Sequence, residues 1–154
     1  MLLFAHIGWG KPVEIDPRNY NRNISVEKAD AIVSFAGPLM NFITALIFAL
    51  IYCAIIKFAK ITFITTTVGS VIITMNIGLG VFNLIPLPPL DGSKIFLPIL
   101  PRGAKTWFIE NERIFYIIFL VIWISGIAGN MISPLISKMT SAILGIALKI
   151  FGLA

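Results

Sequence analysis

One aspartate, Asp91, follows a stretch in which an apolar helix has to end. The stretch runs from Asn83 to Gly92 and reads Asn-Leu-Ile-Pro-Leu-Pro-Pro-Leu-Asp-Gly. Its three prolines lack a backbone N–H and clash with the preceding turn, so a helix cannot continue through them. An opened backbone in hydrocarbon is tolerated only where it is buried in protein or lines a wet cavity. An ionisable side chain beside it could be a metal ligand, a proton relay or an ion-coupling site.

Spacing alone leaves two interpretations of this stretch open. In the first, the prolines lie at membrane depth and Asp91 faces a wet site. In the second, the helix ends at the membrane surface, the prolines form a loop and Asp91 is solvated. Two amides, Asn76 and Asn83, are seven residues apart and therefore lie near one helical face, which could be the wet one.

The composition indicates an integral membrane protein surrounded by a lipid bilayer. Hydrophobic residues make up 58% of the chain and charged residues only 12%, which does not fit a soluble domain. The net charge of +5 comes from residues between apolar runs, as is typical of loop charges, so we expect no nucleic-acid partner. The lone Cys53 has no partner for an internal disulfide and is expected to pack as a small apolar side chain.

The pattern of uncharged runs predicts an all-α, polytopic membrane protein that forms a single membrane domain. We expect three to four transmembrane helices, one of them broken at the proline-rich Leu-Asp-Gly segment. The segment 135–153 carries two lysines and fits either a fourth crossing or an interfacial helix. The three predicted spans are 31–56, 61–85 and 114–133, and Pro134 ends the last of them. Before the first span we expect an apolar stub that ends a preceding helix (1–7) and a polar loop (8–30). Between the second and third spans we expect the proline-rich segment and a second loop (86–113).

Three local features refine this scheme. The alternation in residues 11–17 fits a short extended or edge strand. Ser25 is placed to cap the first span, although no full capping box follows it. Pro38 frees a carbonyl inside that span, and Asn41 could either bond to a neighbouring helix or contact a substrate.

The loop charges predict an orientation. Lys and Arg number four in residues 11–30 and four in residues 92–113, two segments that two crossings place on one side. The opposite connection has only Lys57 and Lys60. This bias predicts that the Asp91 end of the second span faces the cytoplasm.

Four motifs in order give the chain a resemblance to a known family. It resembles the site-2 proteases, intramembrane zinc metalloproteases, and in particular their short prokaryotic members. The similarity covers about Gly8 to Pro101, and the last of the motifs is nearly complete. The motifs are Gly8-Trp-Gly-Lys-Pro-Val13, Asp16-Pro-Arg-Asn19, Ala36-Gly-Pro-Leu-Met-Asn41 and Phe82-Asn-Leu-Ile-Pro-Leu-Pro-Pro-Leu-Asp-Gly92.

The resemblance implies a multi-pass endopeptidase of a prokaryotic cell membrane that cleaves a transmembrane protein substrate. In this family two histidines of a His-Glu-x-x-His helix and the aspartate of Leu-Asp-Gly bind zinc, and the glutamate is the base. Asp91 would then be a metal ligand. The residues that would lie near the substrate backbone are Asn41, Asn83, Pro86, Pro88 and Pro89. Zinc would lower the pKa of its bound water from about 15.7 to about 7.

The chain departs from the family in its histidines. A catalytic zinc needs three protein ligands, and the only histidine is His6, which is too close to the Gly8 motif to replace the His-Glu-x-x-His helix. This pattern predicts an N-terminally truncated member that is inactive alone. Three explanations compete: a fragment of an active protease, a pseudoprotease that binds helices without cutting, and an ion- or proton-handling subunit that uses Asp91. A second copy or another subunit could also supply ligands.

Overall fold

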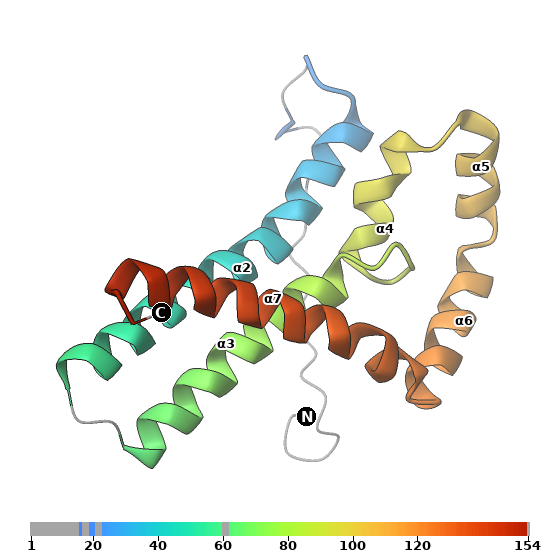
Figure 1. Cartoon of the computed structure of the whole chain (residues 1–154). Coiled ribbons are helices and arrows are strands. Elements are labelled where there is room, and N and C mark those ends of the chain that lie inside the picture. The colour runs from blue at the N-terminus through green and yellow to red at the C-terminus, as the bar shows by residue number, and fades with distance from the viewer. Residues whose placement is uncertain (1–15, 17–18, 21–22, 60–61, 154) are drawn as a thin grey trace.

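The computed structural model describes residues 16, 19–20, 23–59 and 62–153. Over these residues the chain is helical and contains no strand. Its three long helices are α2 (Val26–Phe58), α3 (Phe63–Asn83) and α7 (Ile127–Phe151), and each is long and apolar enough to cross a membrane. They lie side by side, and α7 packs against both α2 and α3 (Figure 1). The protein is therefore a polytopic helical membrane protein, as predicted.

The N-termini of the first two long helices differ in their side-chain capping. Ser25 directly precedes α2, but its side chain makes no capping hydrogen bond, so the cap predicted at Ser25 is not formed. For α3, Thr62 and Thr65 form a reciprocal capping box, in which the Thr65 N–H donates to the Thr62 hydroxyl at 3.2 Å and the Thr62 N–H to the Thr65 hydroxyl at 3.0 Å. These bonds satisfy two backbone donors that a helix N-terminus leaves unpaired.

Small side chains bring α2 and α3 close together. Ala45, Ala49 and Cys53 of α2 are fully buried against α3, and Ala147 of α7 joins this core. Close approach favours helix association in lipid, because it increases van der Waals packing between helices. The predicted apolar packing of Cys53 is thus confirmed by its complete burial.

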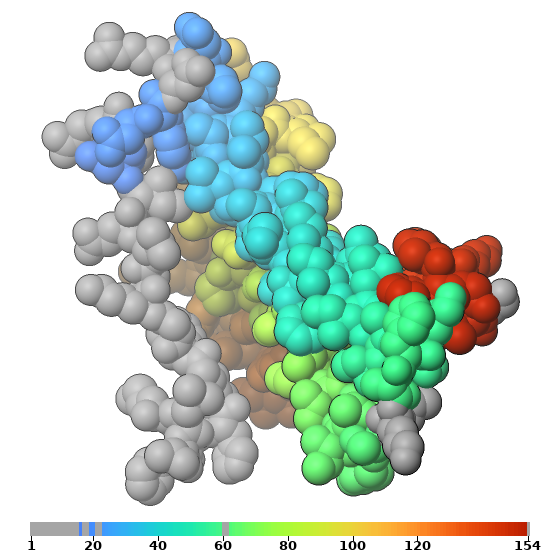
Figure 2. Space-filling model, turned by 90° about the vertical axis from the view of Figure 1, so that its left-hand side faces the viewer, coloured from blue at the N-terminus to red at the C-terminus, as the bar shows by residue number. Residues whose placement is uncertain are grey.

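At one end of the bundle α2 and α7 are tied together. The Lys57 ammonium donates a hydrogen bond of 2.7 Å to the carbonyl oxygen of Phe151, the last residue of α7. The rings of Phe58 and Phe151 meet edge to face, with centroids 6.5 Å apart. Figure 2 shows this meeting of the C-terminal end of α2 with the red end of α7. The cation also stabilises the negative end of the α7 dipole.

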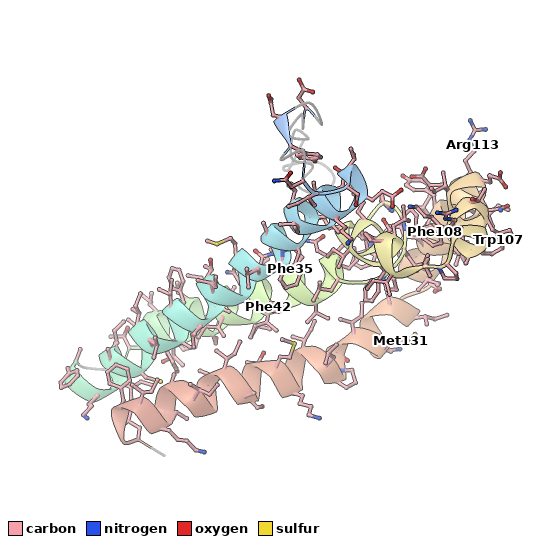
Figure 3. All side chains as sticks on the ribbon, turned by 90° about the horizontal axis from the view of Figure 1, so that it is seen from above. Phe35, Phe42, Trp107, Phe108, Arg113 and Met131 are labelled. Atoms are coloured by element: carbon pink, nitrogen blue, oxygen red, sulfur yellow. The ribbon has the colours of Figure 1, made fainter. Side chains whose placement is uncertain are left out.

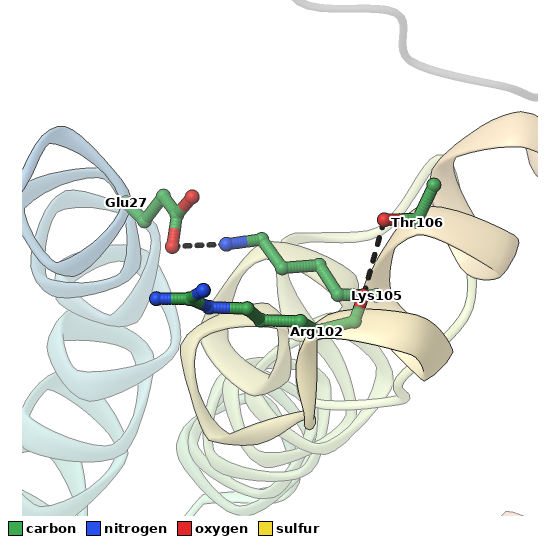
Figure 4. Close-up of polar contacts among 4 residues, drawn as sticks. All are labelled: Glu27, Arg102, Lys105 and Thr106. Atoms are coloured by element: carbon green, nitrogen blue, oxygen red, sulfur yellow. Dashed lines mark hydrogen bonds and ion pairs between the residues drawn. The ribbon is translucent and has the colours of Figure 1, made fainter.

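The other end of the bundle carries the shorter helices. Beside α2 lies α4 (Asp91–Phe96), and after it come η2 (Leu97–Ile99), α5 (Arg102–Glu110) and α6 (Glu112–Ile124). An ion pair between Lys105 and Glu27 joins α5 to the first turn of α2 (Figure 4). Trp107, Phe108 and Arg113 lie together at this end, far from the C-terminus of α7 (Figure 3).

The structure moves the helix boundary that was predicted at Pro134. The break lies at Gly126, whose φ of 74° is left-handed and therefore suits glycine, and α7 continues through Pro134. Proline inside a membrane helix is tolerated because neighbouring groups re-pair the freed carbonyl. The predicted span 114–133 is consequently divided between α6 and the first part of α7, and the segment 135–153 is the remainder of α7.

The other predicted boundaries differ by a few residues. Helix α2 extends beyond 31–56 at both ends, and α3 is slightly shorter than 61–85. With 13 residues, α6 is about 20 Å long, which is less than the roughly 30 Å of bilayer hydrocarbon. The stub 1–7 and most of the strand predicted at 11–17 lie outside the described residues.

Candidate functional site

The proline segment is an irregular link between α3 and α4. Helix α3 ends at Asn83, as the prolines predicted, and short turns follow in which Leu87 N–H donates to Ile85 at 2.8 Å and Leu90 N–H to Leu87 at 2.9 Å. The peptide bond between Pro88 and Pro89 is cis. The chain becomes helical again only at Asp91, the first residue of α4.

Gly92 holds this link in a compact form. A Cβ atom at position 92 would lie 2.5 Å from the carbonyl oxygen of Leu84 and closer still to that of Ile85. These are backbone atoms, which cannot rotate away as the end of a side chain can. Only glycine therefore fits after Asp91. This close backbone contact explains why glycine follows aspartate in the Leu-Asp-Gly sequence.

Asp91 faces the middle of α2. Its Oδ2 atom would be 3.6 Å from a Cβ atom on Gly37, so that the carboxylate lies where α2 has no side chain. The side chain of Asp91 is half-buried, and α4 packs along α2. Ser93 donates a hydrogen bond of 2.7 Å to the Leu90 carbonyl and secures the start of α4. The structure thus brings two motifs together that are about fifty residues apart in the sequence.

The predicted amides have different roles. Asn41 lies one turn after Gly37 on α2 and Asn83 at the end of α3, and both are half-buried. Across the residues that the structure describes, no hydrogen bond involves the side chain of Asn41, Asn83 or Asp91. Asn76 instead donates to the Ile72 carbonyl at 2.9 Å. One N–H of its amide is therefore paired within α3, and the wet face predicted from Asn76 and Asn83 stays a prediction.

Several carbonyls of the proline segment have no hydrogen-bond partner. The turns pair the carbonyls of Ile85, Leu87 and Leu90, whereas no donor reaches those of Leu84, Pro86, Pro88 and Pro89 in the described structure. Among the three predicted prolines, Pro86 and Pro89 are exposed and Pro88 is buried. The segment is consequently a short row of backbone acceptors beside Asp91.

The described residues supply one metal ligand here and not a complete metal site. Among residues 16, 19–20, 23–59 and 62–153, no three His, Cys, Asp or Glu side chains are grouped closely enough to hold a metal ion. The predicted ligand Asp91 is consequently not part of such a group, and His6 lies outside the described residues. The donor set therefore does not fit a catalytic zinc, which needs three protein ligands.

A cavity of about 420 Å³ lies on the other side of the proline segment. Leu84, Ile85 and Leu87 line it from this segment, and Phe82, Phe119 and Trp123 form an aromatic wall with centroids 4.9 to 6.2 Å apart. Sequence reasoning missed this cavity. The aromatic residues at 119 and 123, one turn apart on α6, were the available signal, but nothing local showed that α6 would turn back onto α3.

The comparisons with known proteins identify the family of the chain. The family model of "Peptidase family M50" matches residues 53–126, which include the proline segment and Asp91. A protein of Bacillus subtilis (strain 168) described as "Putative zinc metalloprotease YwhC" is 30% identical over 156 aligned positions, which cover 98% of this chain and 70% of that protein. No solved structure matches the chain significantly.

Proposed function

The chain belongs to peptidase family M50, the site-2 protease family, and on this premise we propose that it is the substrate-binding and aspartate-bearing part of an intramembrane zinc metalloendopeptidase. The observation that carries the proposal is the position of Asp91 against Gly37. A carboxylate that has no partner among the described residues lies half-buried between two helices, at the end of a segment that cannot be helical. An intramembrane ionisable residue in such a setting is typical of a functional site.

The proline segment is proposed to bind the backbone of an unwound substrate. Extended peptides are commonly held by main-chain hydrogen bonds to an exposed edge. The free carbonyls of the exposed Pro86 and Pro89 can accept such bonds from a substrate's N–H groups. Replacing Pro88 and Pro89 by alanine should weaken substrate binding, because the segment could then pair its own carbonyls by continuing the helix.

The proposed metal is zinc, with Asp91 as one ligand. The sequence holds a single histidine and no His-Glu-x-x-His pair, so a complete site requires ligands from outside this sequence, in a longer form of the chain or in a second subunit. The residues present bind and position the substrate in this proposal, and Asp91 closes the metal site from the α4 side.

Zinc content tests the proposal directly. The full chain is purified in detergent and its zinc is measured by elemental analysis, in parallel with an Asp91→Ala variant. Because this sequence supplies only part of a ligand set, we expect zinc that the chain holds together with ligands of a second subunit, and its loss in the variant. Asp30→Ala is the matched control, because Asp30 is a carboxylate of α2 bonded to Tyr20 at 2.5 Å and should leave zinc content unchanged. Zinc that is equal in all three samples, or absent from all, contradicts the role of Asp91 in this chain.

A second candidate function is helix binding without cleavage. One observation favours it. The described residues contain the whole proline segment with its free carbonyls, whereas they do not contain a full set of metal ligands. A pseudoprotease would bind a transmembrane peptide with no zinc and no hydrolysis. An ion-handling subunit would instead show a flux in vesicles that depends on Asp91 and not on zinc.

The Asp91 end of the bundle is proposed to face the cytoplasm. The basis is the excess of Lys and Arg in the segments on that side of the spans. Single-cysteine variants in a Cys53→Ala background test it in intact cells with an impermeant thiol reagent. Exposed Glu110 and exposed Phe58 mark opposite ends of the bundle. We expect a cysteine at 58 to be labelled and one at 110 to be protected, and the reverse pattern would overturn the orientation.

A further inference from the structure

We infer that the cavity beside the proline segment is a binding pocket for a large apolar side chain of the substrate helix. The inference rests on the proposed function, because it takes the ligand to be a transmembrane peptide. The cavity volume of about 420 Å³ falls within the range of roughly 300–1,000 Å³ typical of ligand pockets. It lies between the end of α3, the proline segment and the pair α6 and α7.

The pocket wall is apolar and suited to selection by shape. The described residues that line it include no charged side chain, and its aromatic side is built from Phe82, Phe119 and Trp123. Lipid tails are as apolar as the pocket, so an apolar side chain does not enter it to escape water. Selection must come from packing contacts. Rigid rings on one side and the adaptable Met131 and Met139 on the other supply such contacts.

The position of the pocket relates it to Asp91. Leu84 and Ile85 line the pocket, and the backbone of Gly92 rests on the carbonyls of the same two residues. One layer of backbone therefore separates the pocket from the residue next to Asp91. A peptide paired to the free carbonyls of Pro86 and Pro89, in the same segment, would place a side chain into the pocket close to the bond presented to the carboxylate.

The same backbone favours a peptide over a lipid acyl chain as the occupant. The proline segment lines the pocket through Leu84, Ile85 and Leu87 and also carries the free carbonyls of the exposed Pro86 and Pro89, which need hydrogen-bond donors. A peptide backbone offers N–H groups, whereas an acyl chain offers none. Pairing these carbonyls lowers the cost of leaving them unsatisfied in a low-dielectric region.

Fluorescence of Trp123 tests the inference. The full chain carries Trp9, Trp107 and Trp123, so replacing the first two by phenylalanine leaves Trp123 as the reporter in the pocket wall. The chain is reconstituted in phosphatidylcholine vesicles with a transmembrane leucine–alanine peptide that contains one bromophenylalanine, whose heavy atom quenches tryptophan. We expect saturable quenching that an unbrominated peptide competes away.

Three further variants show that the quenching arises in the pocket. Ala128→Phe fills the pocket from the buried start of α7 and should weaken the apparent affinity about fivefold or more. The matched control Ala142→Phe places the same ring on an exposed position of α7 outside the pocket and should change nothing. Phe119→Ala enlarges the pocket and should shift the preference to a peptide with a larger naphthyl side chain, so the inference does not depend on one variant.

The possible outcomes separate this inference from the proposed function. Quenching by brominated lipid chains that the peptide does not compete away identifies a lipid site and overturns the inference. Equal peptide quenching in Ala128→Phe and Ala142→Phe also overturns it. If zinc binding depends on Asp91 but the peptide does not quench Trp123, the metalloprotease proposal is supported and the pocket inference is overturned. Saturable quenching without zinc supports the pocket in a helix-binding protein and contradicts the protease.

Discussion

The backbone of Gly92 rests on the carbonyl oxygen of Ile85, seven residues earlier in the chain. No side chain fits between them, since a Cβ atom at position 92 would overlap that oxygen. The contact folds the proline segment back on itself and sets the place where α4 starts. The direction in which Asp91 points, toward Gly37, therefore depends on a residue that has no side chain of its own.

Gly92→Ala is expected to displace α4 and Asp91. Because the obstructing atoms belong to the backbone, we expect a loss of about 1–3 kcal/mol in stability, as for other overpacked sites. Thermal unfolding in detergent measures it. Gly103→Ala is the matched control: nothing lies within 4 Å of a Cβ atom there, so its stability should change by less than about 1 kcal/mol and in the stabilising direction. Equal stability of the two variants would contradict the contact.

Gly80 and Phe42 are expected to be energetically coupled. A Cβ atom on Gly80 would lie 2.7 Å from the Phe42 ring, so Gly80→Ala should push α2 and α3 apart. Phe42→Leu removes the ring and should restore much of the loss. A double-mutant cycle on thermal stability should give a coupling of about 0.5–3 kcal/mol. Gly145→Ala, which meets nothing within 4 Å, should show no coupling to Phe42→Leu.

Lys57→Met should loosen the C-terminal end of α7. The substitution removes the hydrogen bond to the Phe151 carbonyl and the favourable charge at the helix end, together worth about 0.3–1 kcal/mol. We expect faster amide hydrogen exchange in the last turn of α7 and no change near Asp91. Lys138→Met, an exposed lysine in the middle of α7, is the control. Unchanged exchange in the last turn would show that Lys57 does not cap α7.

Tyr20 should titrate late, because its hydrogen bond to Asp30 requires the protonated phenol. This hydrogen bond, together with desolvation and the negative charge of Asp30, raises the pKa of Tyr20 from 10.0 to about 12. A raised pKa in the folded state means that the stabilisation is complete below pH 10 and is lost as the pH rises through 12. Alkaline titration of phenolate absorbance should show one late tyrosine that is missing in Tyr20→Phe. Tyr116→Phe should retain it, and a late step in both variants would refute the assignment.

The sequence by itself determined the class of the protein and the location of the site in the chain. Apolar runs and loop charges are local properties, and a helix in lipid must satisfy its backbone internally, so the long helices follow from composition. The end of α3 was also a local matter, because Pro86, Pro88 and Pro89 cannot donate to a helix. The motifs around Asn41 and Asp91 indicated the family because each motif consists of residues that are consecutive in the sequence.

Only the tertiary structure decided what these motifs face. Gly37 lies opposite Asp91 because α4 packs on α2, and no pattern within either segment encodes that register. Pro134 was expected to end a helix, but α7 continues through it at an exposed position, because a membrane helix tolerates an internal proline. Gly126, with its left-handed backbone, made the break instead and let α6 close a cavity over the proline segment. That cavity is built from residues far apart in the chain, and packing alone creates it.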